Sequence, residues 1–251
     1  MLEIINHGPV REVRLARPPV NALNPTLVKS LTQSIRAAQA ESDAVILSGQ
    51  PGMFSAGLDV VELLQLDRDG MTEFWGAFFE LLETLACSPV PVVAAITGHA
   101  PAGGAVMCLM TDYRVMSRGK YKVGLNETRV GLILPLLLHR AMGRLVGTKI
   151  AEQMLVAGTV IDAESAYEIG LVDALEADYE ATIQHAVQWC EELLSLPRQA
   201  MLGNRAFARA HFKAEFAGYT SDDTAAFVTT WFSAEAQQVM HDLVAKLKGK
   251  K

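Results

Sequence analysis

Apolar residues follow two different spacings in the first three quarters of the chain. Short apolar runs at 44–47 and 92–96 have the length and composition of buried strands. Between such runs, apolar residues recur every three to four positions, which is typical of helices that cover a sheet. Because the two kinds of segment alternate, we expect an α/β architecture. The predicted strands cover 2–6, 10–15, 44–48, 92–96 and 112–117, and the predicted helices cover 59–66, 71–86, 103–110, 147–157, 162–169 and 178–194.

A further helix is expected after Asn24-Pro25, because asparagine is a good capping residue and proline suits the first helical turn. Leu27, Leu31 and Ile35 would form its buried face. The polar segment 67–70 (DRDG) is expected to be a loop.

The spacing changes near residue 195. Beyond Leu196-Pro197 the pattern is helical only, which predicts an α/β core over 1–195 and a helical region over 196–251. The large apolar residues of the second part are Phe227, Trp231, Phe232 and Met240. Aromatic residues exposed on a monomer would form an adhesive patch, so we expect this region to take part in oligomer assembly.

Composition narrows the possible classes of protein. The chain has 251 residues, 50% of them hydrophobic, and a net charge of −6. This composition supports a sizeable core, and the acidity argues against nucleic-acid binding. The lysine-rich tail (Lys246, Lys248, Lys250 and Lys251) is expected to be a solvated helix end. No apolar stretch is long enough to cross a bilayer, so we expect no membrane association.

The three cysteines are Cys87, Cys108 and Cys190, an odd number without metal-binding spacing. We therefore expect free thiols in a reducing compartment and no metal site. The first residues lack the charged and long apolar segments of a secretion signal. These features predict a cytoplasmic protein.

Two glycine-marked segments each follow a predicted buried strand and lead into a helical pattern. They are residues 54–59 (FSAGLD) and 98–105 (GHAPAGGA). A strand that turns into a helix leaves unpaired backbone N–H groups, and two such turns can hold one oxygen as an oxyanion hole. We interpret the N–H groups of Ala56 and Gly103 as the two donors. Each motif taken alone is more typical of a turn or a close-packing point, and it is the presence of both, each after a core strand, that favours the oxyanion hole.

Glu127 is the candidate base. It lies among apolar residues in 122–132 (KVGLNETRVGL), and burial would raise its pKa toward neutrality, where a carboxylate can exchange protons. The alternative is a surface glutamate paired with Arg129, and the spacing favours neither. His99 is expected to be packed within its turn, and His139 to lie on the surface.

These motifs resemble those of the enoyl-CoA hydratase/isomerase (crotonase) superfamily over essentially the whole chain. Residues 54–59 match its first oxyanion segment, and 98–104 followed by 112–114 (DYR) match its second. Residues 163–172 (AESAYEIGLV) and 227–235 resemble its later helical motifs. Within the superfamily, 18–23 (PPVNAL) and 124–128 (GLNET) are most similar to Δ3,Δ2-enoyl-CoA isomerases of the mitochondrial type.

The resemblance implies a spiral of β-β-α units and a C-terminal helical oligomerisation region, assembled as a homotrimer or a dimer of trimers. It implies an acyl-CoA substrate, with coenzyme A bound as part of that substrate and no separate cofactor. The implied reaction moves a double bond from C3 to C2, with Glu127 shuttling the proton while Ala56 and Gly103 hold the thioester oxygen. The residues expected to bind substrate are Ala22, Ser55, Gly57, Leu58, Asp59, Gly104, Val106 and Leu132.

Val106 departs from the pattern of typical hydratases, which resemble one another in having a glutamate there. Hydration or thioester hydrolysis on this scaffold would therefore need another polar group, and Asp59, Glu62 and Glu73 are the candidates. A non-catalytic acyl-CoA-binding or assembly protein is the alternative of another class. The retained Glu127 argues against it.

Overall fold

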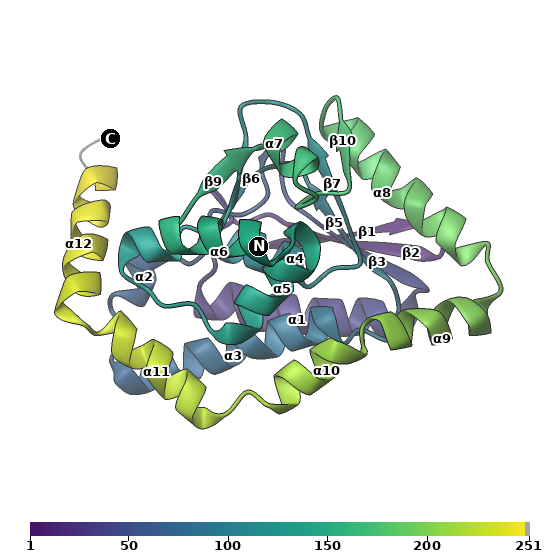
Figure 1. Cartoon of the computed structure of the whole chain (residues 1–251). Coiled ribbons are helices and arrows are strands. Elements are labelled where there is room, and N and C mark those ends of the chain that lie inside the picture. Colours follow the sequence, from purple (N-terminus) through teal and green to yellow (C-terminus); the bar gives the residue numbers. More distant parts are fainter. Residues whose placement is uncertain (249–251) are drawn as a thin grey trace.

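The computed structural model describes residues 1–248 and contains two sheets surrounded by helices (Figure 1). The larger sheet has the strand order β1-β2-β3-β5-β7-β10, in which only β1 and β2 pair antiparallel. Its strands are β1 (Leu2–His7), β2 (Val10–Leu15), β3 (Ala44–Ser48), β5 (Val92–Ile96), β7 (Tyr113–Ser117) and β10 (Ala174–Glu176). The smaller sheet, in the order β4-β6-β8-β9, consists of β4 (Gly52–Met53), β6 (Gly98–Pro101), β8 (Lys122–Gly124) and β9 (Val160–Asp162).

Helices cover both faces of the larger sheet, and this burial explains its continuous apolar strands. Successive side chains of a strand point to opposite faces. Val45 and Leu47 therefore join the core beneath α1 (Pro25–Glu41) and α3 (Arg68–Ala86), whereas Ala44 and Ile46 pack with α8 (Tyr179–Leu194). The other helical elements are α2 (Val60–Leu63), α4 (Gly103–Leu109), η1 (Glu127–Val130), α5 (Leu136–Val146), α6 (Thr148–Ala157), α7 (Ala163–Glu168), α9 (Arg198–Ala208), α10 (Ala210–Ala217), α11 (Ser221–Trp231) and α12 (Ala234–Lys248).

The five predicted strands are all present, and so is the helix capped by Asn24, whose side chain accepts a hydrogen bond from the Leu27 N–H at 2.8 Å. The prediction of a loop at 67–70 is wrong. Asp67 accepts a hydrogen bond from the Gly70 N–H at 2.8 Å and caps α3, which begins at Arg68. Helix α5 and the short strands β4, β6, β8, β9 and β10 were not predicted.

Helices α9, α10 and α11 follow one another along the side of the molecule that holds α1 and α3, and α12 lies beside α2 (Figure 1). Contrary to the predicted adhesive patch, Phe227 and Trp231 are buried within their own chain. The Phe227 ring stacks on Trp75 of α3 with the two planes only 4° apart, and Trp231 is 0% exposed. One hydrophobic cluster includes residues from both sides of position 195, and the division into 1–195 and 196–251 stays a prediction.

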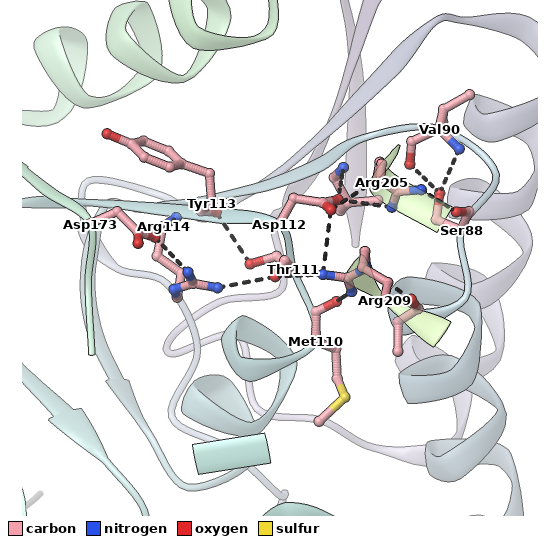
Figure 2. A network of polar contacts seen from close by, with 12 residues as sticks. Ser88, Val90, Met110, Thr111, Asp112, Tyr113, Arg114, Asp173, Arg205 and Arg209 are labelled. Carbon is pink, nitrogen blue, oxygen red and sulfur yellow. Dashed lines mark hydrogen bonds and ion pairs between the residues drawn. The ribbon is translucent and has the colours of Figure 1, made fainter. Parts of the chain in front are cut away.

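A buried polar network also joins the C-terminal helices to the loop between α4 and β7 (Figure 2). Arg205 donates two hydrogen bonds, each 2.9 Å long, to the Asp112 carboxylate. Arg209 donates to the backbone carbonyls of Ala86 and Thr111, both at 3.1 Å. The end of α4 is thereby held against the C-terminal region. Lys250 and Lys251 of the predicted basic tail lie outside the described residues.

Within residues 1–248, no helix combines the length and the apolar character needed to cross a bilayer. Three free cysteines are present, as expected.

Candidate active site

The two glycine-marked segments meet in direct backbone contact. The N–H groups of Phe54 and Ser55 both donate to the His99 carbonyl, at 3.0 and 3.1 Å. A Cβ atom on Gly57 would lie 2.9 Å from the Gly103 nitrogen, and one on Gly104 would lie 2.6 Å from the Ser55 carbonyl oxygen. Real Cβ atoms do not approach so closely, so glycine at these positions is what lets the two segments touch.

Each of the two segments has a backbone N–H without an acceptor among the described residues, at Leu58 and at Gly103. Leu23 donates to the Gly57 carbonyl at 2.8 Å and accepts from the Asp59 N–H at 3.0 Å, so the intervening Leu58 N–H points to the other side. Gly103 is the first residue of α4, where a helix leaves its N–H groups unpaired. Among residues 1–248, neither the Leu58 nor the Gly103 N–H has a hydrogen-bond acceptor.

The prediction that Ala56 supplies a free N–H disagrees with the structure. The Ala56 N–H donates to the Val20 carbonyl at 2.9 Å, and an amide has only one hydrogen to give. Gly57 has a φ of 84°, which turns the chain between Ala56 and Leu58 and makes their N–H groups face different neighbours. Leu58, two residues later, is the free donor of this segment.

Glu127 begins η1, three positions after the last residue of β8, and its side chain is buried. Its Oε2 atom has no hydrogen-bond partner among the described residues. Burial therefore raises the pKa of this carboxyl from 4.5 to about 7. The alternative pairing with Arg129 is wrong, because the Arg129 Nε donates to the Gly158 carbonyl at 2.6 Å instead.

A cavity of about 240 Å³ opens beside Glu127. It is mostly apolar, and it includes five other residues that the sequence placed at the site: Ala22, Ala56, Leu58, Asp59 and Leu132. Gly57, Gly103 and Gly104 form the backbone contact between the two segments, and these three residues, Ser55 and Val106 are not among the wall residues. The wall residues that sequence reasoning missed are Val20, Val60, Val61, Pro101, Ala102, Asn126, Val130, Trp231, Met240 and Leu243.

The three candidates for a second catalytic carboxylate are all held by basic side chains. Asp59 pairs with Arg17 at 2.8 Å. Its side chain also caps α2 by accepting a hydrogen bond from the Glu62 N–H. Glu62 accepts from Asn24 at 2.8 Å and pairs with Arg17 at 3.3 Å. Glu73 is exposed and pairs with Lys29. Of these three, only Asp59 lines the cavity.

The histidines take no part in the cavity wall. The prediction of a packed His99 is confirmed: its Nδ1 accepts from the Lys122 N–H at 3.1 Å and its ring meets Tyr121 edge-on. No group of three or more His, Cys, Asp or Glu side chains within residues 1–248 is arranged to hold a metal ion.

The chain is similar to proteins of known families over most of its length. Residues 6–250 match the family model described as enoyl-CoA hydratase/isomerase. The chain is 28% identical over 249 residues to human "Enoyl-CoA delta isomerase 1, mitochondrial", covering 96% of this chain and 81% of that protein. The match to the rat protein of the same name is 34% over 165 residues, which is 64% of this chain and little more than half, 57%, of the rat protein.

Other proteins similar to this chain are named for a different activity. The chain is 30% identical over 201 residues to "Probable enoyl-CoA hydratase echA17" of Mycobacterium avium, covering 79% of this chain and 77% of that protein. Among solved structures, the crystal structure of human mitochondrial delta3-delta2-enoyl-CoA isomerase matches with a TM-score of 0.93 at 28% identity, covering 100% and 99% of the two chains.

Proposed function

We propose that this chain, which belongs to the enoyl-CoA hydratase/isomerase family, moves the double bond of a 3-enoyl-CoA to the trans-2 position. The observation that carries the proposal is the buried carboxylate of Glu127 in an apolar cavity, whose Oε2 has no hydrogen-bond partner among the described residues. Double-bond migration needs one group that takes a proton and gives it back. A buried glutamate without a partner suits that task.

The thioester oxygen of the substrate would accept hydrogen bonds from the Leu58 and Gly103 N–H groups. These donors are fixed by the backbone and need no rearrangement when negative charge develops on the oxygen. Removal of one such donor from other enzymes costs about 3–4 kcal/mol of transition-state stabilisation. In this proposal Leu58 replaces Ala56 as the donor of the first segment.

Glu127 would remove a proton from C2, and the electron pair of the C2–H bond would move into the thioester to form a dienolate. The same proton would return at C4 as the double bond settles between C2 and C3. Substrate and product have the same composition, so no water is consumed. A pKa of about 7 suits both steps, because the carboxylate must accept the proton and then release it near neutral pH.

Hydration is the second candidate reaction, because several relatives are named as hydratases. It needs a group to activate water in addition to one that handles the C2 proton. The position at which typical hydratases carry a glutamate is Val106, which is 1% exposed. Asp59, the other carboxylate at the cavity, is held by Arg17. These observations favour isomerisation over hydration and over thioester hydrolysis.

The proposal takes coenzyme A as part of the substrate and adds no separate cofactor. It keeps the predicted homotrimer or dimer of trimers, for which the exposed apolar side chains Ile133, Leu136 and Val156 offer contact area. Sedimentation at micromolar concentration tests this assembly, and a clean monomer would contradict it. The cytoplasmic location stays a prediction, and the names of the human and rat relatives include the word mitochondrial.

The decisive experiment incubates the purified protein separately with 3-enoyl-CoA and with trans-2-enoyl-CoA. Chromatography and mass spectrometry distinguish an isomer of unchanged mass from a hydrated product. We expect isomerisation of the first substrate and little hydration of the second, with both activities absent from Glu127→Gln. Hydration faster than isomerisation would overturn the proposal, and the absence of any reaction would favour a non-catalytic acyl-CoA-binding protein.

A further inference from the structure

The wall of the cavity contains both exposed and fully buried side chains. At its rim, Val61 of α2 is 46% exposed. Among its most buried wall residues, Leu132 is 6% exposed, and Trp231 and Met240 are both 0% exposed. We take this buried part of the wall, from the segment after η1 and from α11 and α12, as the closed end of the cavity.

This closed end is firmly held. The side chain of Gln237 donates to the Trp231 carbonyl at 2.8 Å, which ties the start of α12 to the end of α11. A Cβ atom on Gly131 would lie 3.0 Å from the Ala236 Cα, so α12 rests directly on the backbone that follows η1. The Trp231 ring also packs against Phe227, which stacks on Trp75 of α3. A longer ligand could not pass without unpacking this core.

We propose that the closed end limits the acyl group to medium length, about eight carbons, because of the volume that the cavity offers. This inference rests on the proposed function, because it takes the cavity as the acyl site. An apolar cavity of about 150 Å³ holds one benzene ring, which has six carbons. Scaled to 240 Å³, the pocket holds roughly ten non-hydrogen atoms. The thioester sulfur and oxygen take two of them.

The length limit predicts that kcat/KM stops rising at a certain acyl length in a series of substrates with increasingly long chains. We call this point the break. While the acyl group fits, each added methylene buries more apolar surface, and kcat/KM should rise by about fourfold per methylene. Beyond the limit, the next methylene meets Trp231 or Met240 and the gain stops. We therefore expect kcat/KM to rise to about eight carbons and to be at least tenfold lower at twelve, since misfit in an apolar pocket changes rates by about 10–200-fold.

The test measures kcat/KM for 3-enoyl-CoAs of six, eight, ten, twelve and sixteen carbons. Trp231→Leu shortens the side chain at the closed end and should move the break to longer chains, raising the twelve-carbon to eight-carbon ratio by about tenfold. Met240→Ala is the second variant, with a smaller shift in the same direction. Val228→Ala on α11 is the matched control, because Val228 is 5% exposed but does not line the cavity. Its chain-length profile should equal that of the wild type.

A second readout does not depend on turnover. Titration calorimetry with saturated acyl-CoAs of four to sixteen carbons should show the same break in Kd, and the same shift in Trp231→Leu. A break in binding without isomerisation would overturn the proposed function and leave the length limit standing. Kd and kcat/KM that improve steadily to sixteen carbons in the wild type would overturn the limit, and so would variants that keep the wild-type break while remaining folded by circular dichroism.

Discussion

Two buried glutamates of this protein have opposite surroundings. Glu12, on β2, is 0% exposed and has a partner on every side: His7 at 2.8 Å, the Arg14 Nε at 2.9 Å and the Ser48 hydroxyl at 2.6 Å. Glu127 is 8% exposed, and its Oε2 has no hydrogen-bond partner among the described residues. One buried carboxylate therefore has hydrogen-bond partners for both of its oxygens, whereas the other has an unpartnered oxygen beside a cavity.

The difference distinguishes a carboxylate whose contacts suit a structural role from one whose surroundings suit the proposed proton transfer. A buried charge is costly unless it is paired and hydrogen-bonded, so the contacts of Glu12 are what make it tolerable inside the sheet. Nothing comparable surrounds Glu127, and the rise of its pKa to about 7 is the consequence. Burial alone does not mark a group for proton transfer, whereas a titratable carboxylate that is buried in a cavity wall with an unpartnered oxygen has the properties such a group needs.

The largest effect should come from Glu127→Gln. Glutamine keeps the shape but cannot accept the C2 proton, so turnover of 3-enoyl-CoA should fall by about 10⁴-fold, the upper end for general acid–base catalysis. Steady-state assays measure this loss, and thermal unfolding shows whether the fold survives. A loss of less than about tenfold in a folded variant would mean that Glu127 is not the base.

Gly103→Pro should have the next largest effect on the rate. Proline lacks the N–H that would hold the thioester oxygen, and turnover should fall by about 10²–10³-fold while Glu127 is untouched. The first helical position otherwise accepts proline. Circular dichroism must accompany the assay, because a new side chain at this position approaches Leu23. A folded variant with wild-type turnover would exclude the Gly103 N–H as a donor.

The raised pKa of Glu127 predicts linked pH dependences of activity and stability. As a base it must be ionised, so kcat/KM should rise up to about pH 7 and level off above it. For stability, the folded protein keeps this proton up to about pH 7, whereas the unfolded chain releases it near pH 4.5. Between these values the folded state binds the extra proton.

The contribution of Glu127 to stability therefore falls as pH rises from about 4.5 to about 7, in total by up to about 3 kcal/mol. Glu127→Gln should lack this fall. Denaturant unfolding of both proteins at several pH values measures it. Parallel stability curves for the two proteins would contradict the raised pKa.

Glu12→Gln is the matched counterpart and should have the smallest effect of the set. Loss of the charge weakens its hydrogen bonds to His7 and Arg14, so the free energy of unfolding should fall by about 2 kcal/mol. This loss of unfolding free energy is modest because the side chain of Arg14 is still 21% exposed to solvent. Turnover measured well below the unfolding temperature should not change. A large loss of activity in the folded Glu12→Gln protein would undo the distinction between the two glutamates.

Local patterns in the sequence predicted much of the fold and the central residues of the candidate site. The apolar runs at 44–48 and 92–96 predicted the central strands, and both glycine segments meet as expected. Helix α5 was missed although Pro135, its cap, precedes a helical spacing of apolar residues that could have revealed it. The spiral crotonase fold expected from the resemblance is confirmed by the match to the human isomerase structure.

Other features depend on contacts between distant segments. The choice between Ala56 and Leu58 as the free donor is decided by Val20 and Leu23, which bind the backbone of this segment from elsewhere in the chain. Trp231 and Met240 close the cavity from more than a hundred residues beyond Glu127, and no local pattern indicates that. Sequence periodicity predicts which residues are buried, but not which cavity they enclose.

The central claim is that one buried carboxylate carries a proton from C2 to C4, and isotope transfer tests it most directly. A 3-enoyl-CoA with deuterium at C2 is isomerised in ordinary water, and the product is examined by nuclear magnetic resonance and mass spectrometry. A single shielded base predicts that a substantial fraction of the product carries deuterium at C4, since the Glu127 Oε2 is buried away from solvent. Product whose new hydrogen at C4 comes entirely from solvent would contradict a single-glutamate shuttle.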